Sequence, residues 1–428
     1  MQELQKLQKT LLNIKFIDLN FSNINLSQQQ INLYKQVIKQ RTNTVSMSID
    51  LNKTTINKEL INSLFKRISK IPCLQNLSIR LGESKAFSFK EIFEFLSKLQ
   101  IVSLKFNCNF SNEKDVLYFS DFLQKMQNLK SLKLDLILQY FKDFEKIKSE
   151  ISKMDCLEQL ILKVNQNSCV NGTQYFQNCI NQSNCLEFLS LNLSLMQYDQ
   201  SKMNEVVKEL QKANGLKVLK LVIKLDEYQL NNLPFYQCLF QIWPQLKQVT
   251  YFYLHCDYLR TQECMFLLSE LSKLNSLKFV YLSGLNIKLI SQMSSFFESL
   301  NNKFNLHLDL AKFRTNIYIL IEEYNLFSKS LLQVKNLQAI HLPLTQVYNQ
   351  EPYYLPKIFD SLEQMKSLKS ITLDISTTLK SYQKCTTTNL LKLKNLQYIS
   401  LQNNQALINE NKKFFYRKLP KLVMVLAY

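Results

Sequence analysis

Two histidines and an aspartate in the C-terminal half of the chain are the residues whose types and spacing come closest to catalytic chemistry. His307 and Asp309 are two residues apart, and His341 takes the place of His307 in the next copy of a repeated leucine pattern. Side chains two apart share one face of a strand, and histidines on adjacent strands stand about 5 Å apart, close enough to couple their titrations. No Ser-His-Asp arrangement completes this set, so we interpret the histidines as surface residues and expect no enzymatic activity.

The cysteines and glycines offer little further chemistry. Ten cysteines are scattered along the chain, and none forms the C-x-x-C spacing typical of a zinc site. Cys169, Cys179 and Cys185 come nearest to a cluster, which leaves a metal or disulfide role open there; we expect most of the others to be core thiols in a reducing compartment. The four glycines are far apart, whereas phosphate-binding loops need several close together. The sequence therefore predicts no metal and no cofactor.

The element that must position any site is a repeated pattern, Leu-x-x-Leu-x-Leu-x-Leu. Its first position advances by 27 to 31 residues at a time between Leu74 and Leu277, and weaker copies extend it from Ile14 to Leu422. A period of this length is typical of a solenoid, in which each unit buries its apolar face against its neighbours. The four clearest copies are Leu129-Leu132-Leu134-Leu136, Leu157-Leu160-Leu162-Val164, Leu186-Leu189-Leu191-Leu193 and Leu216-Leu219-Leu221-Ile223.

Each copy predicts a strand followed by a helix. Alternation through Leu132, Leu134 and Leu136 indicates a strand with one buried face, while residues 58–68 carry apolar side chains at helical spacing. Strand and helix in alternation require parallel strands with right-handed crossovers, so strands should line the inner side and helices the outer side. Further helices are expected near residues 88–99, 111–126, 143–154, 200–213, 261–274, 288–300 and 354–366.

This pattern resembles the leucine-rich repeat family, and the long repeat is similar to its ribonuclease-inhibitor-like subclass. The resemblance covers nearly all 428 residues and implies an α/β horseshoe of about 14–15 repeats, forming a single domain over residues 1–428. Residues 1–13 are predicted to form an N-terminal cap helix. Irregular repeats or loops are predicted at 311–334, where the pattern weakens, and at 343–356, where prolines are densest.

Charge and hydropathy limit the kind of partner and the cellular location that we expect. The net charge is +19, which favours an acidic partner such as nucleic acid, lipid headgroups or acidic protein segments, although lysines on outer helices also serve solubility. No stretch approaches the eighteen apolar residues of a membrane span, and the first residues lack the apolar core of a signal peptide. We therefore expect an intracellular, cytoplasmic protein, with a cytoskeletal or ciliary assembly as one setting.

Aligning the predicted strands suggests two patches on the outward face. The first is a basic band of Arg80, Lys105, Lys133, Lys163 and Lys220. The second is an apolar patch on the same outward positions, where buried residues are not expected. Apolar side chains exposed in this way often mark a contact surface, and aromatic ones often anchor it. Its members are Phe188, Val218, Val222, Phe252, Phe279 and Tyr281. Residues 249–254 are apolar on both parities, so a slip of one residue there would turn some members into core.

Three functions remain open from the sequence. The preferred one is a non-catalytic protein-interaction scaffold, a subunit of a larger assembly that binds an acidic partner through its concave face. The alternative is a subunit that binds RNA or a ribonucleoprotein through the basic band, and a weaker one is GTPase activation or another regulatory role, which some relatives with this fold perform. The apolar strand at Leu422–Tyr428 has no segment after it, so another chain is expected to cover its edge.

Overall fold

The structure is a computed structural model of the whole chain. It describes residues 15–25, 27–39, 43–54, 57–82, 88–138, 142–166, 185–195, 208–225, 247–260, 266–267, 269–271, 273–286, 305–309, 328–329, 331–343, 354–374, 386, 388–402, 415–419, 421–422 and 424–427.

The chain forms two compact units, Met1–Leu216 and Lys217–Tyr428. Each unit is an α/β structure in which parallel strands follow one another in sequence order and alternate with helices. The predicted fold class is therefore confirmed as a parallel repeat architecture. The prediction of one continuous domain over residues 1–428 stays a prediction.

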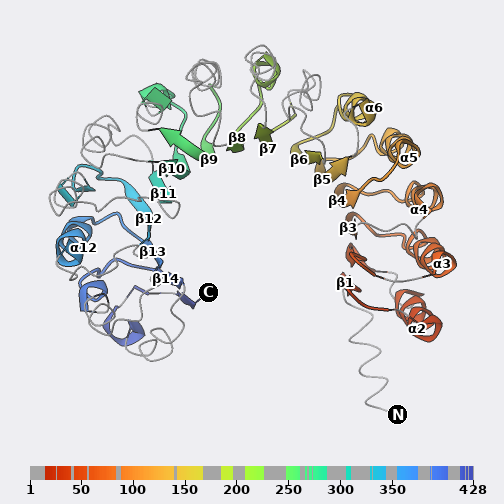
Figure 1. Cartoon of the computed structure of the whole chain (residues 1–428), viewed down its shortest axis with the longest axis horizontal. Coiled ribbons are helices and arrows are strands. Elements are labelled where there is room, and N and C mark those ends of the chain that lie inside the picture. Colours follow the sequence, from red (N-terminus) through yellow and green to blue (C-terminus); the bar gives the residue numbers. More distant parts are fainter. Residues whose placement is uncertain are drawn as a thin grey trace. The chain divides into compact units, whose positions relative to one another are not determined.

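The first unit has seven strands in its described part. Each strand pairs in parallel with the next along the chain. The helices lie together on one side of these strands (Figure 1). The strands are β1 (Phe16–Asn20), β2 (Ser46–Asp50), β3 (Asn76–Gly82), β4 (Ser103–Asn109), β5 (Ser131–Leu138), β6 (Gln159–Gln166) and β7 (Phe188–Leu195), and the helices are α2 (Gln28–Lys39), α3 (Lys58–Ile68), α4 (Phe89–Leu96), α5 (Glu113–Gln124) and α6 (Lys142–Ile151).

Local chemistry explains the helices of this unit. At α3, the Asn57 side chain accepts a hydrogen bond from the backbone N–H of Glu59, which satisfies one of the donors left open at a helix start. Glu59 lies in the first turn and Lys66 and Arg67 in the last, so all three complement the helix dipole. The apolar stripe of α3 is buried, as predicted, through Ile61, Leu64, Phe65 and Ile68.

Six phenylalanines form the core between β4, α4 and α5. Phe106 of β4 stacks on Phe119 with ring centroids 4.6 Å apart, and Phe93 stacks on Phe122 at 5.2 Å. Phe89 and Phe110 extend the same cluster. Aromatic contacts of this kind add to the burial of their large surfaces, so β4 is firmly held with its alternate residues facing away from the core.

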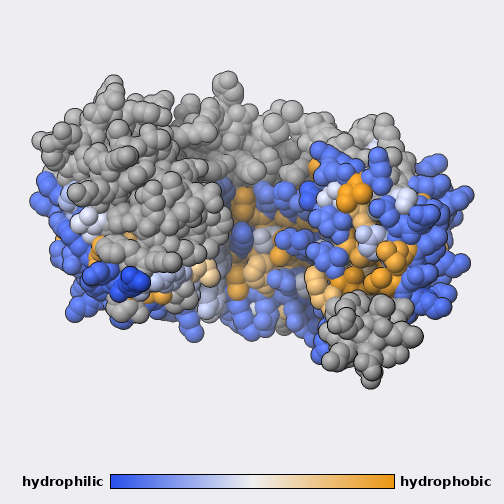
Figure 2. All heavy atoms as spheres, turned by 90° about the horizontal axis from the view of Figure 1, so that it is seen from below, coloured by the Kyte–Doolittle hydropathy of each residue, from blue (hydrophilic) through white to orange (hydrophobic). Residues whose placement is uncertain are grey.

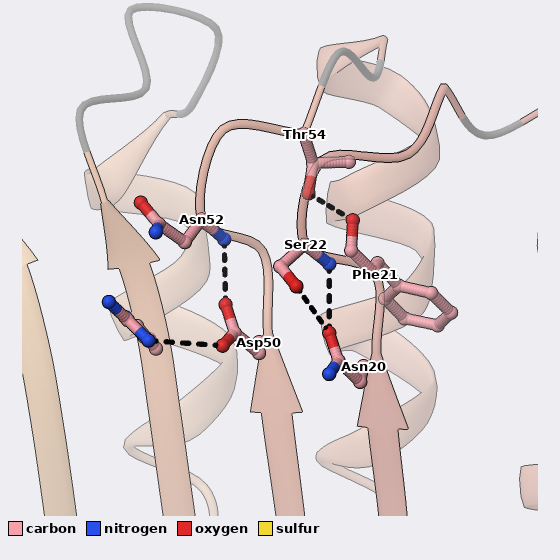
Figure 3. A network of polar contacts seen from close by, with 7 residues as sticks. Asn20, Phe21, Ser22, Asp50, Asn52 and Thr54 are labelled. Carbon is pink, nitrogen blue, oxygen red and sulfur yellow. Dashed lines mark hydrogen bonds and ion pairs between the residues drawn. The ribbon is translucent and has the colours of Figure 1, made fainter. Parts of the chain in front are cut away.

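The first strands end in a repeated turn (Figure 3). Asn20 accepts hydrogen bonds from the backbone N–H and the hydroxyl of Ser22, and Asp50 accepts one from the backbone N–H of Asn52, so both side chains form Asx-type turns. Thr54 donates its hydroxyl to the Phe21 carbonyl at 2.7 Å. One repeat later Gly82 has a φ of +61°, and a Cβ there would collide with the Asn52 side chain.

The second unit repeats the plan. Its described strands again pair in parallel in chain order. Figure 1 shows α12 on the same side of these strands as the other described helical turns. The elements are β8 (Val218–Leu225), β9 (Tyr251–Arg260), β10 (Phe279–Asn286), β11 (Asn305–Asp309), β12 (Leu337–Pro343), α12 (Tyr354–Gln364), β13 (Ser370–Asp374), β14 (Tyr398–Gln402) and β15 (Met424–Ala427).

The segments predicted to be irregular lie partly outside the described residues. Of 311–334, only 328–329 and 331–334 are described, and of 343–356, Pro343 ends β12 while 354–356 form the first turn of α12. Pro356 is tolerated there because the N–H groups of a first helical turn have no partner within the helix. The predicted cap at 1–13 and the helix expected at 288–300 lie outside the described residues.

The β1–α2 end of the first unit exposes apolar side chains. Phe16, Ile24 and Leu33 are 55%, 44% and 59% exposed, and Figure 2 shows hydrophobic residues gathered at this end. In a solenoid such an end is covered by a cap segment, and the cap at residues 1–13 stays a prediction. Among the described helices, none has the length and hydropathy needed to cross a bilayer.

Candidate functional site

The outward side chains of β9 are Tyr251, Tyr253 and His255. Phe252 and Leu254 between them are 0% and 2% exposed and belong to the core. Phe252 was predicted to face outward, and that prediction is wrong. Successive residues of a strand point to opposite faces, so the buried Phe252 turns both neighbouring tyrosines outward.

The reason for the error is a change in repeat length. The strand register pairs Val218 with Tyr251 and Phe279 with Tyr251, so the segments Val218–Leu221, Tyr251–Leu254 and Phe279–Leu282 are equivalent. The first position of the pattern is therefore Val249, which is fully buried, and not Leu246. Comparing these three segments, each of which ends in leucine, would have found the register from sequence alone.

Five rings form a contiguous cluster on β9, β10 and β11, which we call the aromatic face: Tyr251, Tyr253, Phe279, Tyr281 and His307. Phe279 is its centre, with ring centroids 5.8 Å from Tyr251, 5.5 Å from Tyr253 and 4.4 Å from His307. Tyr253 also lies 5.9 Å from Tyr281. These separations are typical of favourable aromatic pairs, so the rings support one another and present a connected surface.

Strand β8 borders the aromatic face with residues that the sequence predicted. Val218 lies opposite Tyr251, Lys220 opposite Tyr253 and Val222 opposite His255. The two valines are partly exposed and Lys220 is exposed. The structure therefore brings Val218, Val222, Phe279 and Tyr281 together with Tyr251, Tyr253 and His307, which were not predicted as members of the apolar patch. It also places the exposed Lys220 at their border.

Burial sets the charge of the aromatic face. It lowers the pKa of His307 from its ordinary 6.5 to about 4, because the charged imidazolium loses hydration beside Phe279. Burial, together with nearby Tyr251, raises the pKa of Tyr253. Both groups are consequently neutral near pH 7, and the face offers apolar ring surface with hydroxyl groups but no charge of its own.

A polar row follows two residues further along the strands. His255 Nδ1 lies 2.7 Å from Ser283 Oγ, and Ser283 is paired with Asp309 in the register of β10 and β11. The predicted opposition of His307 and His341 is wrong: an irregularity between β11 and β12 places Ala339 opposite His307, and His341 opposite Asp309. Ser283 is only 4% exposed, which leaves a substrate little access to its hydroxyl.

Two of the five cations of the basic band predicted from the sequence are neutralised by ion pairs. Arg80 Nη1 lies 3.5 Å from Asp50 Oδ2, and Lys163 Nζ lies 3.0 Å from Asp135 Oδ2, both pairs formed across adjacent strands. Within the described residues Lys105 and Lys133 form no such pair. Lys220 lies in the second unit, beside Tyr253. We call the outward residues Asp50, Arg80, Lys105, Lys133, Asp135 and Lys163 the charged face.

Phe188, the remaining member of the predicted apolar patch, belongs to the first unit. It starts β7 in the first unit, where it is partly exposed and pairs in register with Gln159. Of the four cysteines whose side chains the structure describes, Cys108 is buried and Cys73, Cys156 and Cys185 are exposed, while the expectation for the others stays a prediction. Cys169 and Cys179 lie outside the described residues, and no metal-binding group of three His, Cys, Asp or Glu occurs within them.

Comparison of the chain with known proteins finds no matching family model and no matching curated protein.

Proposed function

We propose that this protein is a divergent leucine-rich repeat protein of the ribonuclease-inhibitor-like subclass that binds another protein through its aromatic face, as a non-catalytic subunit of a larger assembly. Parallel strands alternating with helices in both units support the family proposal. The thiols of Cys73, Cys156 and Cys185 are exposed and free, which supports an intracellular, reducing setting, cytoplasmic and including cytoskeletal or ciliary assemblies.

The single observation that carries the binding proposal is the run of aromatic rings on outward positions of three adjacent strands. Tyr251 is 43% exposed, whereas the neighbouring Phe252 on the same strand is 0% exposed. Large apolar groups clustered on a surface mark contact sites, and tyrosine is a favoured anchor because it gains much contact area while losing little side-chain entropy.

The proposed partner presents apolar side chains to the rings and a carboxylate to Lys220. The rings carry no charge near pH 7, so the apolar contact supplies affinity. Lys220 lies opposite Tyr253 and is the exposed cation at this border, so it favours an acidic residue in the partner segment.

The experiment compares co-purification of partners with tagged full-length protein from its native cells. Combined Tyr253→Ala and Tyr281→Ala substitutions remove two anchors, and the specific partners should fall by at least about tenfold, since truncating a buried aromatic anchor commonly weakens binding that much or more. Tyr398→Ala is the matched control, because Tyr398 is also 43% exposed and lies on β14 of the same unit. Equal partner recovery from the double variant and the control would reject the aromatic face as the binding surface.

Binding of single-stranded RNA is the second candidate, because exposed aromatic rings beside a lysine also suit base stacking. Titration of a fluorescent ten-nucleotide oligouridylate at increasing salt separates the two. A dissociation constant that rises steeply with salt and depends on Tyr253 and Tyr281 supports RNA, whereas weak binding indifferent to both tyrosines supports a protein partner.

A further inference from the structure

Two lysines on the charged face of the first unit stand directly opposite each other. Lys105 is the middle residue of Leu104-Lys105-Phe106 on β4, and Lys133 is the middle residue of Leu132-Lys133-Leu134 on β5. All four flanking residues are 1% exposed or less. Phe106 is held by Phe93 and Phe119 in the aromatic core, so the outward direction of Lys105 is fixed by packing.

The register places the two lysine side chains next to each other on adjacent strands. Lys105 and Lys133 are partners in the parallel pairing of β4 and β5, and side chains in such positions stand about 5 Å apart. Like charges in opposite positions destabilise a sheet. We therefore expect this arrangement to cost the fold some stability, and packing alone gives no reason for keeping both lysines.

The neighbouring charges do not relieve this repulsion. Asp50 pairs with Arg80, and Asp135 pairs with Lys163 rather than with Lys133 on its own strand. Within the part of the chain that the structure describes, Lys105 and Lys133 form no ion pair. They are therefore the two cations of the charged face whose positive charge is not neutralised by a neighbouring carboxylate and can attract a ligand.

We propose that the Lys105–Lys133 pair is an anion subsite that binds one carboxylate, an Asp or Glu side chain, on a segment of a partner protein. Two lysine side chains that start about 5 Å apart on adjacent strands can each direct an ammonium group to one oxygen of a carboxylate placed between them. Ser103 and Asn107 flank Lys105 on the same face of β4 and add polar surface around the subsite.

The charges around the subsite favour a single carboxylate over a polyanion. Asp135 lies two residues from Lys133 on the same face of β5, about 7 Å along the strand. Asp50 lies on the same face two strands before β4. These carboxylates hold Arg80 and Lys163 in ion pairs, so the unpaired positive charge is confined to the two lysines. One lysine pair suits a single acidic side chain, whereas a nucleic acid strand or an anionic membrane surface is bound by many cations. The inference extends the proposed protein binding to a second surface, and rests on that function only for the class of partner.

The test uses full-length protein whose lysines are reductively methylated with 13C, which keeps their positive charge. The probe is the blocked peptide Gly-Ser-Glu-Gly-Ser at low salt, with Gly-Ser-Gln-Gly-Ser as its neutral twin. The signals assigned to Lys105 and Lys133 should shift in a saturable way with the glutamate peptide alone. Lys105→Gln should weaken the binding seen at Lys133 by about tenfold, as expected for loss of one charge-assisted contact.

Matched variants separate this subsite from net charge and from the aromatic face. Lys66→Gln on helix α3 removes the same single charge away from the strands and should leave peptide binding unchanged. Tyr253→Ala should also leave it unchanged, so failure of one surface does not imply failure of the other. Equal shifts with the neutral twin, equal loss in the helix variant, or tighter binding of a ten-nucleotide oligouridylate at these lysines would each overturn the proposal.

Stability gives a second readout that does not need a ligand. Lys105→Gln and Lys133→Gln should each raise the midpoint of thermal unfolding by about 1 °C, because each removes the repulsion of the other ammonium group. A lowered midpoint in both variants would show that the lysines support the fold and would also overturn the proposal.

Discussion

The charged face of β2–β6 and the aromatic face of β9–β11 are built on the same backbone plan and differ in what fills the outward positions. On the charged face, Arg80 forms an ion pair with Asp50 and Lys163 forms one with Asp135, in each case across neighbouring strands. On the aromatic face, Phe279 contacts rings on both sides, and the titratable groups Tyr253 and His307 are neutral near pH 7. The difference teaches that the inward residues of the repeat set the scaffold, while the outward residues vary independently and can specify separate contacts.

The largest effect should distinguish inward from outward residues on one strand. Phe252→Ala should lower the free energy of unfolding of the second unit by about 3–5 kcal/mol, because it opens a cavity at a side chain that is 0% exposed. Tyr253→Ala, one residue away, should cost roughly 1 kcal/mol or less, since its ring faces outward. Urea unfolding followed by circular dichroism measures both; equal losses would mean that the register of β9 is misplaced.

An effect of intermediate size is expected on the pH dependence of stability, through His307 of the aromatic face. The pKa of His307 is about 4 in the folded state against 6.5 when exposed, so the unfolded state binds more protons between these values. Stability contributed by neutral His307 is fully present above about pH 6.5 and is lost as the pH falls towards 4. His307→Phe should reduce this loss.

The measurement is the urea midpoint at pH 7.0, 5.5 and 4.5 for the protein and the variant. The energy involved is smaller than a burial calculation would give, because the imidazole keeps part of its solvent exposure. An identical fall in midpoint for both proteins would contradict the assignment to His307.

The smallest effect should come from the ion pairs of the charged face. Arg80→Gln and Lys163→Gln each break one partly exposed pair and should lower stability by about 0.2–1 kcal/mol at low salt, with little loss at 1 M salt. Lys105→Gln should instead raise the midpoint of thermal unfolding. Measuring the midpoints of all three variants at two salt concentrations therefore tests which cations of this face are paired. A loss of equal size in all three variants would contradict the division of this face into paired and unpaired cations.

The sequence predicted the scaffold well because its signals are repeated many times. The helix predicted at 58–68 is α3, and the helices expected near 88–99, 111–126, 143–154 and 354–366 are α4, α5, α6 and α12. Lys105 and Lys133 were also placed correctly in one outward column. Each of these predictions rests on alternation or helical spacing in which apolar and polar residues are clearly separated.

The candidate site was harder because its strands break that separation. Residues 249–254 are apolar on both parities, and alternation alone could not decide whether Phe252 or Tyr253 faces outward. His307 and His341 were misaligned because an irregularity between β11 and β12 shifts the register. The periodicity of the sequence could not show which cations are neutralised, because that is decided by side-chain distances between strands. An example is the 3.0 Å between Lys163 Nζ and Asp135 Oδ2.

The central claim is that outward residues of β9–β11 touch a protein partner, and site-specific photo-cross-linking tests it most directly. The photoreactive amino acid p-benzoylphenylalanine is placed at position 253 in one protein and at position 398 in another, because Tyr253 and Tyr398 both lie on strands of the second unit. After irradiation of native cells, the account predicts a discrete covalent adduct from position 253 and none from position 398. No adduct from position 253, or the same adduct from both positions, would contradict it.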